Sequence, residues 1–224
     1  MPCAIRRSMP YTLVIFDLDG TLVDSLPFFM RNLNAVADRF GFRKVAADEV
    51  EALRHGSTSE ILAKLEIPRW KLPRIARHFR QLKAEQAASI PLFPGAADML
   101  QALSESGLRL ALVSSDSEAN ARRKLGPAAA LFSHYDCTAA LFGKPSKFRR
   151  VLKRARIDAA QAIAIGDETR DIEAARANGI ACGVVTWGYA APGALRARQP
   201  DLVFTEIADI PRALLAPAPA AAVP

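Results

Sequence analysis

The sequence predicts an α/β protein with a doubly wound parallel sheet as its core and an all-helical domain inserted near the start of that core. Three observations carry this prediction. A short run of β-branched and apolar residues, 11–16, ends in acidic and turn residues. Residues 27–88 have helical apolar spacing and no strand pattern. From Gly95 onward strands and helices alternate, which is typical of a parallel sheet covered by helices on both faces.

Length and composition are those of a globular protein. The 224 residues fall between one and two domains, and 50% of them are hydrophobic while 24% are charged. No apolar run reaches the roughly 18 to 20 residues of a membrane helix, and residues 1–10 lack the pattern of an export signal. Cys3, Cys137 and Cys182 form no CxxC pair, which suits a reducing compartment. We therefore expect a cytoplasmic protein, monomeric or homodimeric, that does not contact a membrane.

The charge of the chain is strongly positive. A net charge of +7 and a pI near 9.7 suit a nucleic-acid surface or a site that handles anions. The densest basic group, Arg149-Arg150 with Lys153-Arg154, has no aromatic residues between its charges. A solvated basic helix explains this pattern better than a nucleic-acid interface, so we do not expect a nucleic-acid partner.

The first predicted strand ends in two carboxylates, in the run Asp17-Leu18-Asp19-Gly20-Thr21. Side chains two apart on an extended backbone point the same way, so Asp17 and Asp19 can face one site, with Gly20 allowing a sharp turn behind them. A strand that ends in an Asx-type turn explains the same residues. This segment alone does not decide between the two interpretations.

Helical signals fill the next stretch. Apolar residues recur at helical spacing before Gly41, a residue type that often ends a helix; they are Phe29, Leu33, Val36, Ala37 and Phe40. Three more helices are expected: one over about 48–54, one that opens with the capping-box sequence Ser57-Thr58-Ser59-Glu60, and one that carries Leu72, Ile75, Phe79 and Leu82.

Proline-containing segments flank this helical stretch. Pro27 and the segment 90–95 can act as stiff crossings out of the core and back into it. We therefore expect an inserted helical domain at 27–88 and a core formed by 11–26 plus 89–215. A flexible arm at 1–10 and a disordered Ala/Pro-rich tail at 216–224 complete the chain.

The second part of the core alternates between helix and strand. The expected order is a helix over 96–107, a strand over 108–113, a helix over 117–125, a weaker strand over 135–139, the loop 142–145, a basic helix over 146–156, a strand over 162–165, a helix over 168–178, and strands over 182–186 and 202–204.

Polar residues follow several of these strands. They are Asp17 and Asp19 after the first, Ser114 and Ser115 after the second, Lys144 after the third, and Asp167 with Asp171 after the fourth. The ligand crevice of an open α/β sheet lies beyond the carboxyl ends of its strands, so these residues should converge. Carboxylates at one place repel one another unless a cation lies between them, and oxygen ligands without His or Cys suit Mg²⁺. Lys144, Ser114 and the helix amides after Ser115 would then face an anion bridged by that ion.

Each of these residues also has a simpler interpretation. A lone Ser114 is more often a capping serine, and Lys144 before Pro145 is more often a solvated loop lysine. Asp167 and Asp171 can simply complement a helix dipole. Their joint occurrence at strand ends favours a single site.

The chain resembles the haloacid dehalogenase superfamily. The run DLDGTLVDS at 17–25, Ser114 at its strand end, Lys144-Pro145 and the run GDETRD at 166–171 look like the four motifs of that superfamily, and the likeness covers nearly all of 11–208. The insertion at 27–88 is similar to the helical cap of the phosphoglycolate phosphatase-like branch. The resemblance implies a Rossmann-like catalytic core with an inserted cap.

The resemblance also implies an activity: a Mg²⁺-dependent phosphoric monoester hydrolase that acts on a small phosphorylated metabolite, such as phosphoglycolate or a sugar phosphate. Asp17 would be the nucleophile that forms an aspartyl-phosphate, and Asp19 would protonate the leaving oxygen and then activate water. Asp167, the Asp17 carboxylate and the Asp19 carbonyl would bind Mg²⁺, and Asp171 would support the site through water or the catalytic lysine.

The phosphoryl group would contact Ser114, Ser115 and Lys144. The sequence departs from its relatives here, because they often have Asn in place of Ser115 and a second proline where this chain has Ser146-Lys147. Neither change removes a charged catalytic group, so the departures concern the geometry of the phosphoryl contacts more than the reaction.

Two other functions remain open, a β-phosphoglucomutase-like sugar phosphomutase and a catalytically silent metabolite-binding protein. Asp19 argues against the dehalogenases that name the superfamily, since these lack an acid at that position. Arg54, His55 and Gly56 lie in a loop between cap helices and either contact the substrate or simply end an exposed helix.

Overall fold

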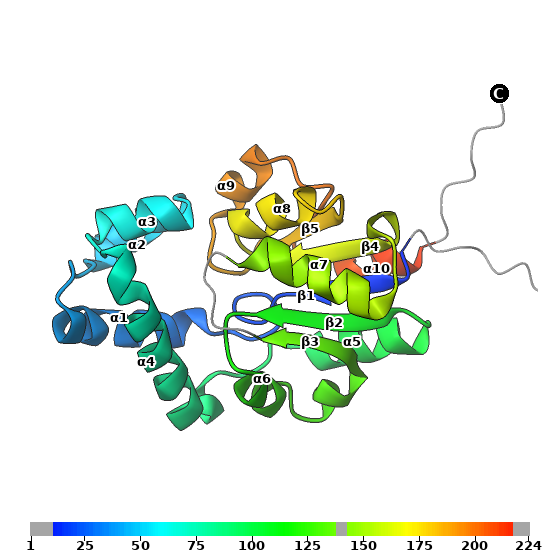
Figure 1. Ribbon diagram of the computed structural model, residues 1–224, viewed down its shortest axis with the longest axis horizontal. Coiled ribbons are helices and arrows are strands. Elements are labelled where there is room, and N and C mark those ends of the chain that lie inside the picture. Colours follow the sequence, from blue (N-terminus) through cyan, green and yellow to red (C-terminus); the bar gives the residue numbers. More distant parts are fainter. Residues whose placement is uncertain (1–10, 138–142, 217–224) are drawn as a thin grey trace, which may run out of the picture.

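The computed structural model describes residues 11–137 and 143–216. Its core is a six-stranded sheet in the order β3-β2-β1-β4-β5-β6, and every neighbouring pair is parallel. Helices cover both faces of this sheet (Figure 1). The predicted doubly wound fold is therefore confirmed, with β1 at the centre, where the strand order reverses.

The strands are short, and β1 and β4 are buried along their whole length. They are β1 (Leu13–Phe16), β2 (Arg109–Ser114), β3 (Phe132–Cys137), β4 (Ala162–Gly166), β5 (Ala181–Val185) and β6 (Leu202–Phe204). In β1, Val14 and Phe16 belong to one apolar cluster and Leu13 and Ile15 to another. Successive side chains of a strand point to opposite faces, so β1 joins the two layers of the core.

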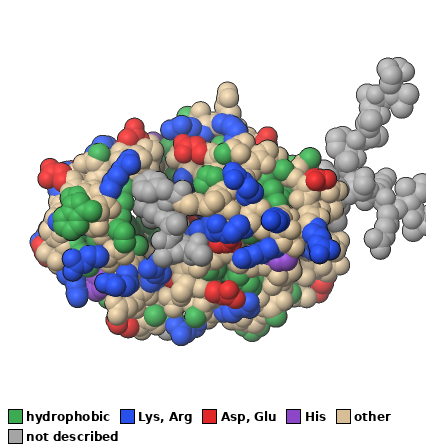
Figure 2. Space-filling model, in the orientation of Figure 1, with side chains coloured by type: hydrophobic (Ala, Val, Ile, Leu, Met, Phe, Trp, Pro, Cys, Tyr) green, Lys and Arg blue, Asp and Glu red, His purple; other side chains and the backbone are tan. Residues whose placement is uncertain are grey.

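Two sets of helices cover the two faces. α5 (Ala96–Glu105), α6 (Glu118–Leu125) and α10 (Asp209–Leu215) pack on the face of Val14 and Phe16. α7 (Lys144–Ala155), α8 (Thr169–Arg176) and α9 (Pro192–Ala197) pack on the other face. The basic residues of α7 that are exposed lie on its outer side, and Figure 2 shows blue side chains gathered over that part of the surface.

The structure corrects several predicted boundaries. α7 begins at Lys144, so residues 144–145 are not part of a loop; Pro145 fits the first helical turn, where its missing N–H is not needed. β3 begins three residues earlier than expected, at Phe132. The short helices α9 and α10 were not predicted. Residues 138–139 of the weak strand, the arm at 1–10 and residues 217–224 of the tail lie outside the described residues.

Four helices lie between β1 and α5 along the chain: α1 (Leu26–Phe40), α2 (Val50–Arg54), α3 (Thr58–Lys64) and α4 (Leu72–Glu85). Figure 1 shows them together at one end of the molecule, beyond the carboxyl ends of the strands. The chain enters and leaves this region side by side, because the Asp24 amide donates to the Pro91 carbonyl at 2.9 Å and the Phe93 amide to the Leu22 carbonyl at 3.0 Å. No described helix is both long and apolar enough to span a bilayer.

Two helix signals in this region are confirmed. Gly41 ends α1 in the left-handed conformation, with φ of 63°. At the start of α3 the Glu60 amide donates to the Ser57 hydroxyl at 3.3 Å, and the Ser57 amide donates to the Glu60 carboxylate at 2.6 Å. This reciprocal pair is the predicted capping box.

Replacement of Ser57 by Ala is expected to lower the free energy of unfolding by about 1 kcal/mol, because it leaves an amide of the first turn of α3 without its acceptor. Urea titration would measure the change. Ser59→Ala is the matched control, since Ser59 is exposed on the same helix. Equal effects of the two substitutions would show that the capping box does not stabilise α3.

Candidate active site

Three carboxylates meet where β1 and β4 end side by side. Asp17 follows β1, Asp167 follows β4, and Asp171 lies in the first turn of α8. All three are buried, and one oxygen from each lies within 4.8 Å of the others. Burial raises the pKa of Asp167 well above its usual value, and the charges of Glu168 and Asp17 raise it further. Burial likewise raises the pKa of Asp17. The cluster therefore favours a bound cation.

Lys144 supplies positive charge to this cluster. Its Nζ lies 2.8 Å from Asp17 Oδ2 and also pairs with Asp171. Burial would lower the pKa of Lys144, but the charges of Asp17 and Asp171 outweigh that effect and raise it. Lys144 is therefore a fixed cation, and the cluster still has more negative than positive charge.

Asp167 is held in place by two donors. The Thr21 hydroxyl donates to Oδ1 and the Tyr189 amide donates to Oδ2, both at 2.8 Å. The backbone packs closely around this carboxylate, since a Cβ on Gly20 would lie 2.2 Å from Asp167 Oδ2 and a Cβ on Gly188 would lie 2.3 Å from Asp167 Cβ. Gly20 also has a φ of +77°. Gly20 and Thr21 after β1 and the segment after β5 thus position Asp167 together.

The donor set fits a hard divalent cation such as Mg²⁺, because it consists of buried carboxylate oxygens whose charges are incompletely offset. Asp17 and Asp167 lie where the predicted ligands should be. Asp171 belongs to the same group, so it is placed to act as a ligand as well as a support. The Asp19 carboxylate lies outside the group, which leaves its backbone carbonyl as the only atom of Asp19 suited to the predicted metal role.

The Asp19 carboxylate is instead held by two lysines. Lys83 Nζ from α4 lies 2.6 Å from Oδ2, and Lys124 Nζ from α6 lies 3.2 Å from Oδ1. Lys124 also lies 2.9 Å from the Asp116 carboxylate. Burial alone would raise the pKa of Asp19, but Lys83 and Lys124 together hold it well below its usual range. Asp19 is therefore ionised in this arrangement and is a weak base while both lysines contact it.

Ser114 is the last residue of β2, and Ser115 follows it directly. The Ser114 hydroxyl accepts the Asp116 amide at 3.0 Å, which leaves its own proton free to donate. Lys147 Nζ donates to the Ser114 carbonyl at 2.6 Å and so holds the strand end. Ser115 lines a cavity that also reaches Asp19. Ser115 therefore shares this space with Asp19, whereas Ser114 is buried at the strand end and does not line the cavity.

The loop residues of the inserted region differ in their surroundings. Arg54 and Gly56 line the cavity, whereas His55 is largely exposed and lies 3.7 Å from the Glu51 carboxylate. Arg54 donates to the Tyr189 carbonyl at 3.0 Å and to the Gly188 carbonyl at 3.1 Å. Arg54 therefore ties α2 to the segment after β5, and its contact with a substrate remains a prediction.

Sequence reasoning missed four residues of the site: Thr21, Lys83, Asp116 and Lys124. Thr21 directly follows the predicted catalytic turn, so its position in the sequence could have indicated that it belongs to the site. Lys83 and Lys124 lie on amphipathic helices, where lysine normally faces water, and nothing in their spacing distinguishes them from solvated residues.

Comparisons with known proteins agree with this geometry. A family model described as haloacid dehalogenase-like hydrolase matches residues 14–185. The chain is 32% identical to a phosphoglycolate phosphatase of Synechococcus elongatus, over 90% of this chain and 96% of that protein. It is 30% identical to a phosphoglycolate phosphatase of Cupriavidus necator, over 94% of this chain and 96% of that protein.

A solved structure gives the same result for the fold. A haloacid dehalogenase-like family hydrolase from Streptococcus pneumoniae matches with a TM-score of 0.76 at 22% identity, covering 92% of this chain and 99% of that one. At that identity the likeness concerns the fold alone.

Saturation with Mg²⁺ is expected to raise the unfolding temperature. At a hundredfold excess over Kd a ligand adds about 2.7 kcal/mol, and for a chain of this size each kcal/mol moves the midpoint by roughly 2 to 4 °C. Calorimetry would measure the shift. Asp167→Asn should abolish it, whereas Asp38→Asn, at an exposed carboxylate of α1, should retain it. A shift that survives in Asp167→Asn would contradict the metal assignment.

Replacement of Lys83 by Met is expected to raise the pKa of Asp19, because one of the two charges that lower it is lost. Titration of the Asp19 carboxyl carbon by NMR would follow the change. Lys64→Met, at an exposed lysine of α3, is the control and should leave Asp19 unaffected. An unchanged titration in Lys83→Met would mean that α4 does not control this acid.

Proposed function

This chain belongs to the haloacid dehalogenase-like hydrolase family, and we propose that it is a Mg²⁺-dependent phosphatase that hydrolyses a small phosphorylated metabolite through an aspartyl-phosphate on Asp17. The observation that supports this most is the position of Asp17: a buried carboxylate after the central strand, 2.8 Å from Lys144 and grouped with Asp167 and Asp171. Relatives named phosphoglycolate phosphatase support a phosphomonoester as the substrate class.

The metal would be held by the Asp17 and Asp167 carboxylates, with Asp171 and the Asp19 carbonyl as further candidates. When bound, Mg²⁺ would supply positive charge that offsets the repulsion between a carboxylate nucleophile and the phosphoryl oxygens. Lys144 Nζ, the Ser114 hydroxyl and Ser115 would bind those oxygens from other sides and orient the phosphorus toward Asp17.

In the first step an Asp17 oxygen attacks phosphorus, the bond from phosphorus to the leaving oxygen breaks, and Asp19 donates a proton to that oxygen. In the second step Asp19 takes a proton from water, whose oxygen attacks the phosphorus of the aspartyl-phosphate. Free phosphate leaves, and the Asp17 carboxylate is restored with Asp19 again protonated. Two displacements at phosphorus, with Asp17 as nucleophile in the first and leaving group in the second, thus replace a single direct attack by water.

Asp19 must carry a proton at the start of this cycle, yet Lys83 and Lys124 keep it ionised in the present arrangement. We infer that Lys83 separates from Asp19 when substrate is bound, since α4 belongs to the inserted region. Residues 27–88 would then act as a cap that closes over the leaving group and excludes water. Arg54 would contribute by holding α2 against the core.

Replacement of Asp17 by Asn is expected to lower release of phosphate from a generic aryl phosphate by roughly a thousandfold or more, because the nucleophile is lost. Asp24→Asn, outside the carboxylate cluster, is the control and should remain active. Calorimetry would establish that both variants fold. Substantial turnover by Asp17→Asn would refute the proposal, and conversion of a sugar phosphate to its isomer without free phosphate would favour a mutase instead.

A further inference from the structure

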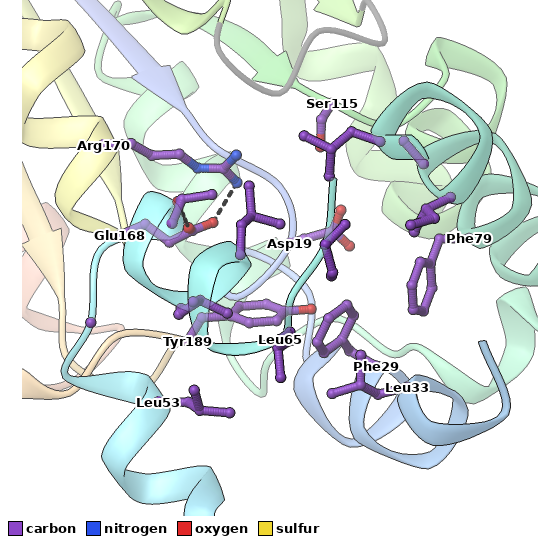
Figure 3. A pocket seen from close by; sticks show the side chains of 18 of the residues that line it. Asp19, Phe29, Leu33, Leu53, Leu65, Phe79, Ser115, Glu168, Arg170 and Tyr189 are labelled. Carbon is purple, nitrogen blue, oxygen red and sulfur yellow. Dashed lines mark hydrogen bonds and ion pairs between the residues drawn. The ribbon is translucent and has the colours of Figure 1, made fainter. Parts of the chain in front are cut away.

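A cavity of about 700 Å³ opens beside Asp19 and extends between the inserted helices α1 to α4. Its size lies within the range of roughly 300 to 1,000 Å³ that holds drug-sized ligands. Figure 3 shows Asp19, Ser115 and Tyr189 around the same space as side chains from the inserted helices. The space available to a leaving group is therefore much larger than a two-carbon acid needs.

The two ends of this cavity differ in polarity. Asp19, Lys83 and Ser115 border the end near the carboxylate cluster. The walls farther into the inserted region are mostly apolar and include Phe29, Leu33, Leu53, Leu65 and Phe79 (Figure 3), although Arg54, Thr58 and Arg69 also line the cavity. A phosphomonoester enters such a site with its phosphoryl group at the polar end and its remaining part against the apolar walls.

Aromatic rings shape the apolar part. Phe29 stacks on Phe79 with ring centroids 5.0 Å apart, and it meets Tyr189 edge to face at 5.9 Å. These rings come from α1, α4 and the segment after β5, so the core and the inserted helices both contribute to one wall. Flat apolar surfaces of this kind bind aliphatic and aromatic groups well and offer few partners to hydroxyl groups.

We propose that the substrate is a phosphomonoester of a bulky, mainly apolar alcohol, whose aliphatic or aromatic part fills this cavity. The inference rests on the proposed phosphatase function and narrows its substrate. A two-carbon acid would leave most of the apolar wall in contact with water, and a sugar would place its hydroxyl groups against carbon. Both are poorer matches to the lining than an apolar leaving group.

The polar end of the cavity carries a further positive charge. Arg80 also lines the cavity, and its Nη1 is buried with no hydrogen-bond partner among the described residues. Arg80 and Lys83 are one helical turn apart on α4, so together they can hold a single anionic substituent at the polar end. This pair accommodates one polar group, whereas the apolar walls account for the rest of the volume.

Ethyl, butyl and hexyl phosphate provide the test, because their leaving oxygens have similar basicity and differ in apolar length. We expect kcat/KM of the wild-type protein to rise by at least roughly tenfold from ethyl to hexyl phosphate, since each methylene in an apolar pocket adds selectivity. Phosphoglycolate should be hydrolysed less efficiently than hexyl phosphate. A series that is flat or falls with length, or a preference for phosphoglycolate, would overturn the proposal.

Filling the cavity provides the matched variant. Ala76 lines the cavity on α4, so Ala76→Phe should remove the gain in kcat/KM from ethyl to hexyl phosphate. Ala63→Phe, the same change at an exposed position of α3 outside the cavity, should keep the gain. Loss of the gain in both variants, or in neither, would contradict the assignment of the cavity.

Calorimetric binding to the Asp17→Asn variant separates this inference from the proposed function. Hexyl phosphate should bind it roughly tenfold or more tightly than ethyl phosphate. Tight, length-dependent binding without any hydrolysis by the wild type would refute the phosphatase and support the cavity assignment. If the wild type hydrolyses these esters but neither hydrolysis nor binding depends on chain length, the phosphatase function is supported and the cavity assignment is refuted.

Discussion

The mutual repulsion of three buried carboxylates is the constraint on which the rest of this structure depends. Asp17, Asp167 and Asp171 lie within 4.8 Å of one another, where little water screens their charges. Their neighbourhood follows from the sheet order, because β1 and β4 pair directly. Lys144 pairs with two of them, and the donors on Thr21 and Tyr189 hold the third. The incomplete compensation makes the site a strong candidate for a divalent cation.

The helix α4 connects Asp19 to the inserted region. Ala76, Phe79 and Lys83 follow one another at helical spacing on α4, and all three line the same cavity. Lys83 contacts Asp19, whereas Phe79 forms part of the apolar wall. A ligand that presses on this wall therefore acts on the same helix that sets the charge of Asp19. In the proposed mechanism, recognition of the leaving group and protonation of its oxygen are coupled through α4.

Local patterns predicted well wherever a short segment sets its own conformation. The capping box at Ser57, the end of α1 at Gly41 and the strand β6 at 202–204 all appear where the sequence places them. The prediction that Lys144 lies in a loop was wrong. A lysine followed by a proline is common in loops, but here both residues belong to the first turn of α7. The helices α9 and α10 are too short for a periodic signal.

By itself the sequence determined the order of the strands along the chain, most of the helices between them, and the presence of acids, serines and a lysine after the strands. Periodicity and turn chemistry act over a few residues, so they can be read directly from the chain. Only the tertiary structure decided the direction of the Asp19 carboxylate and the shape of the cavity. Asp19 contacts Lys83, which lies 64 positions away in the sequence, and Lys124, which lies 105 positions away. Such buried ion pairs depend on how helices pack and leave no local pattern in the sequence.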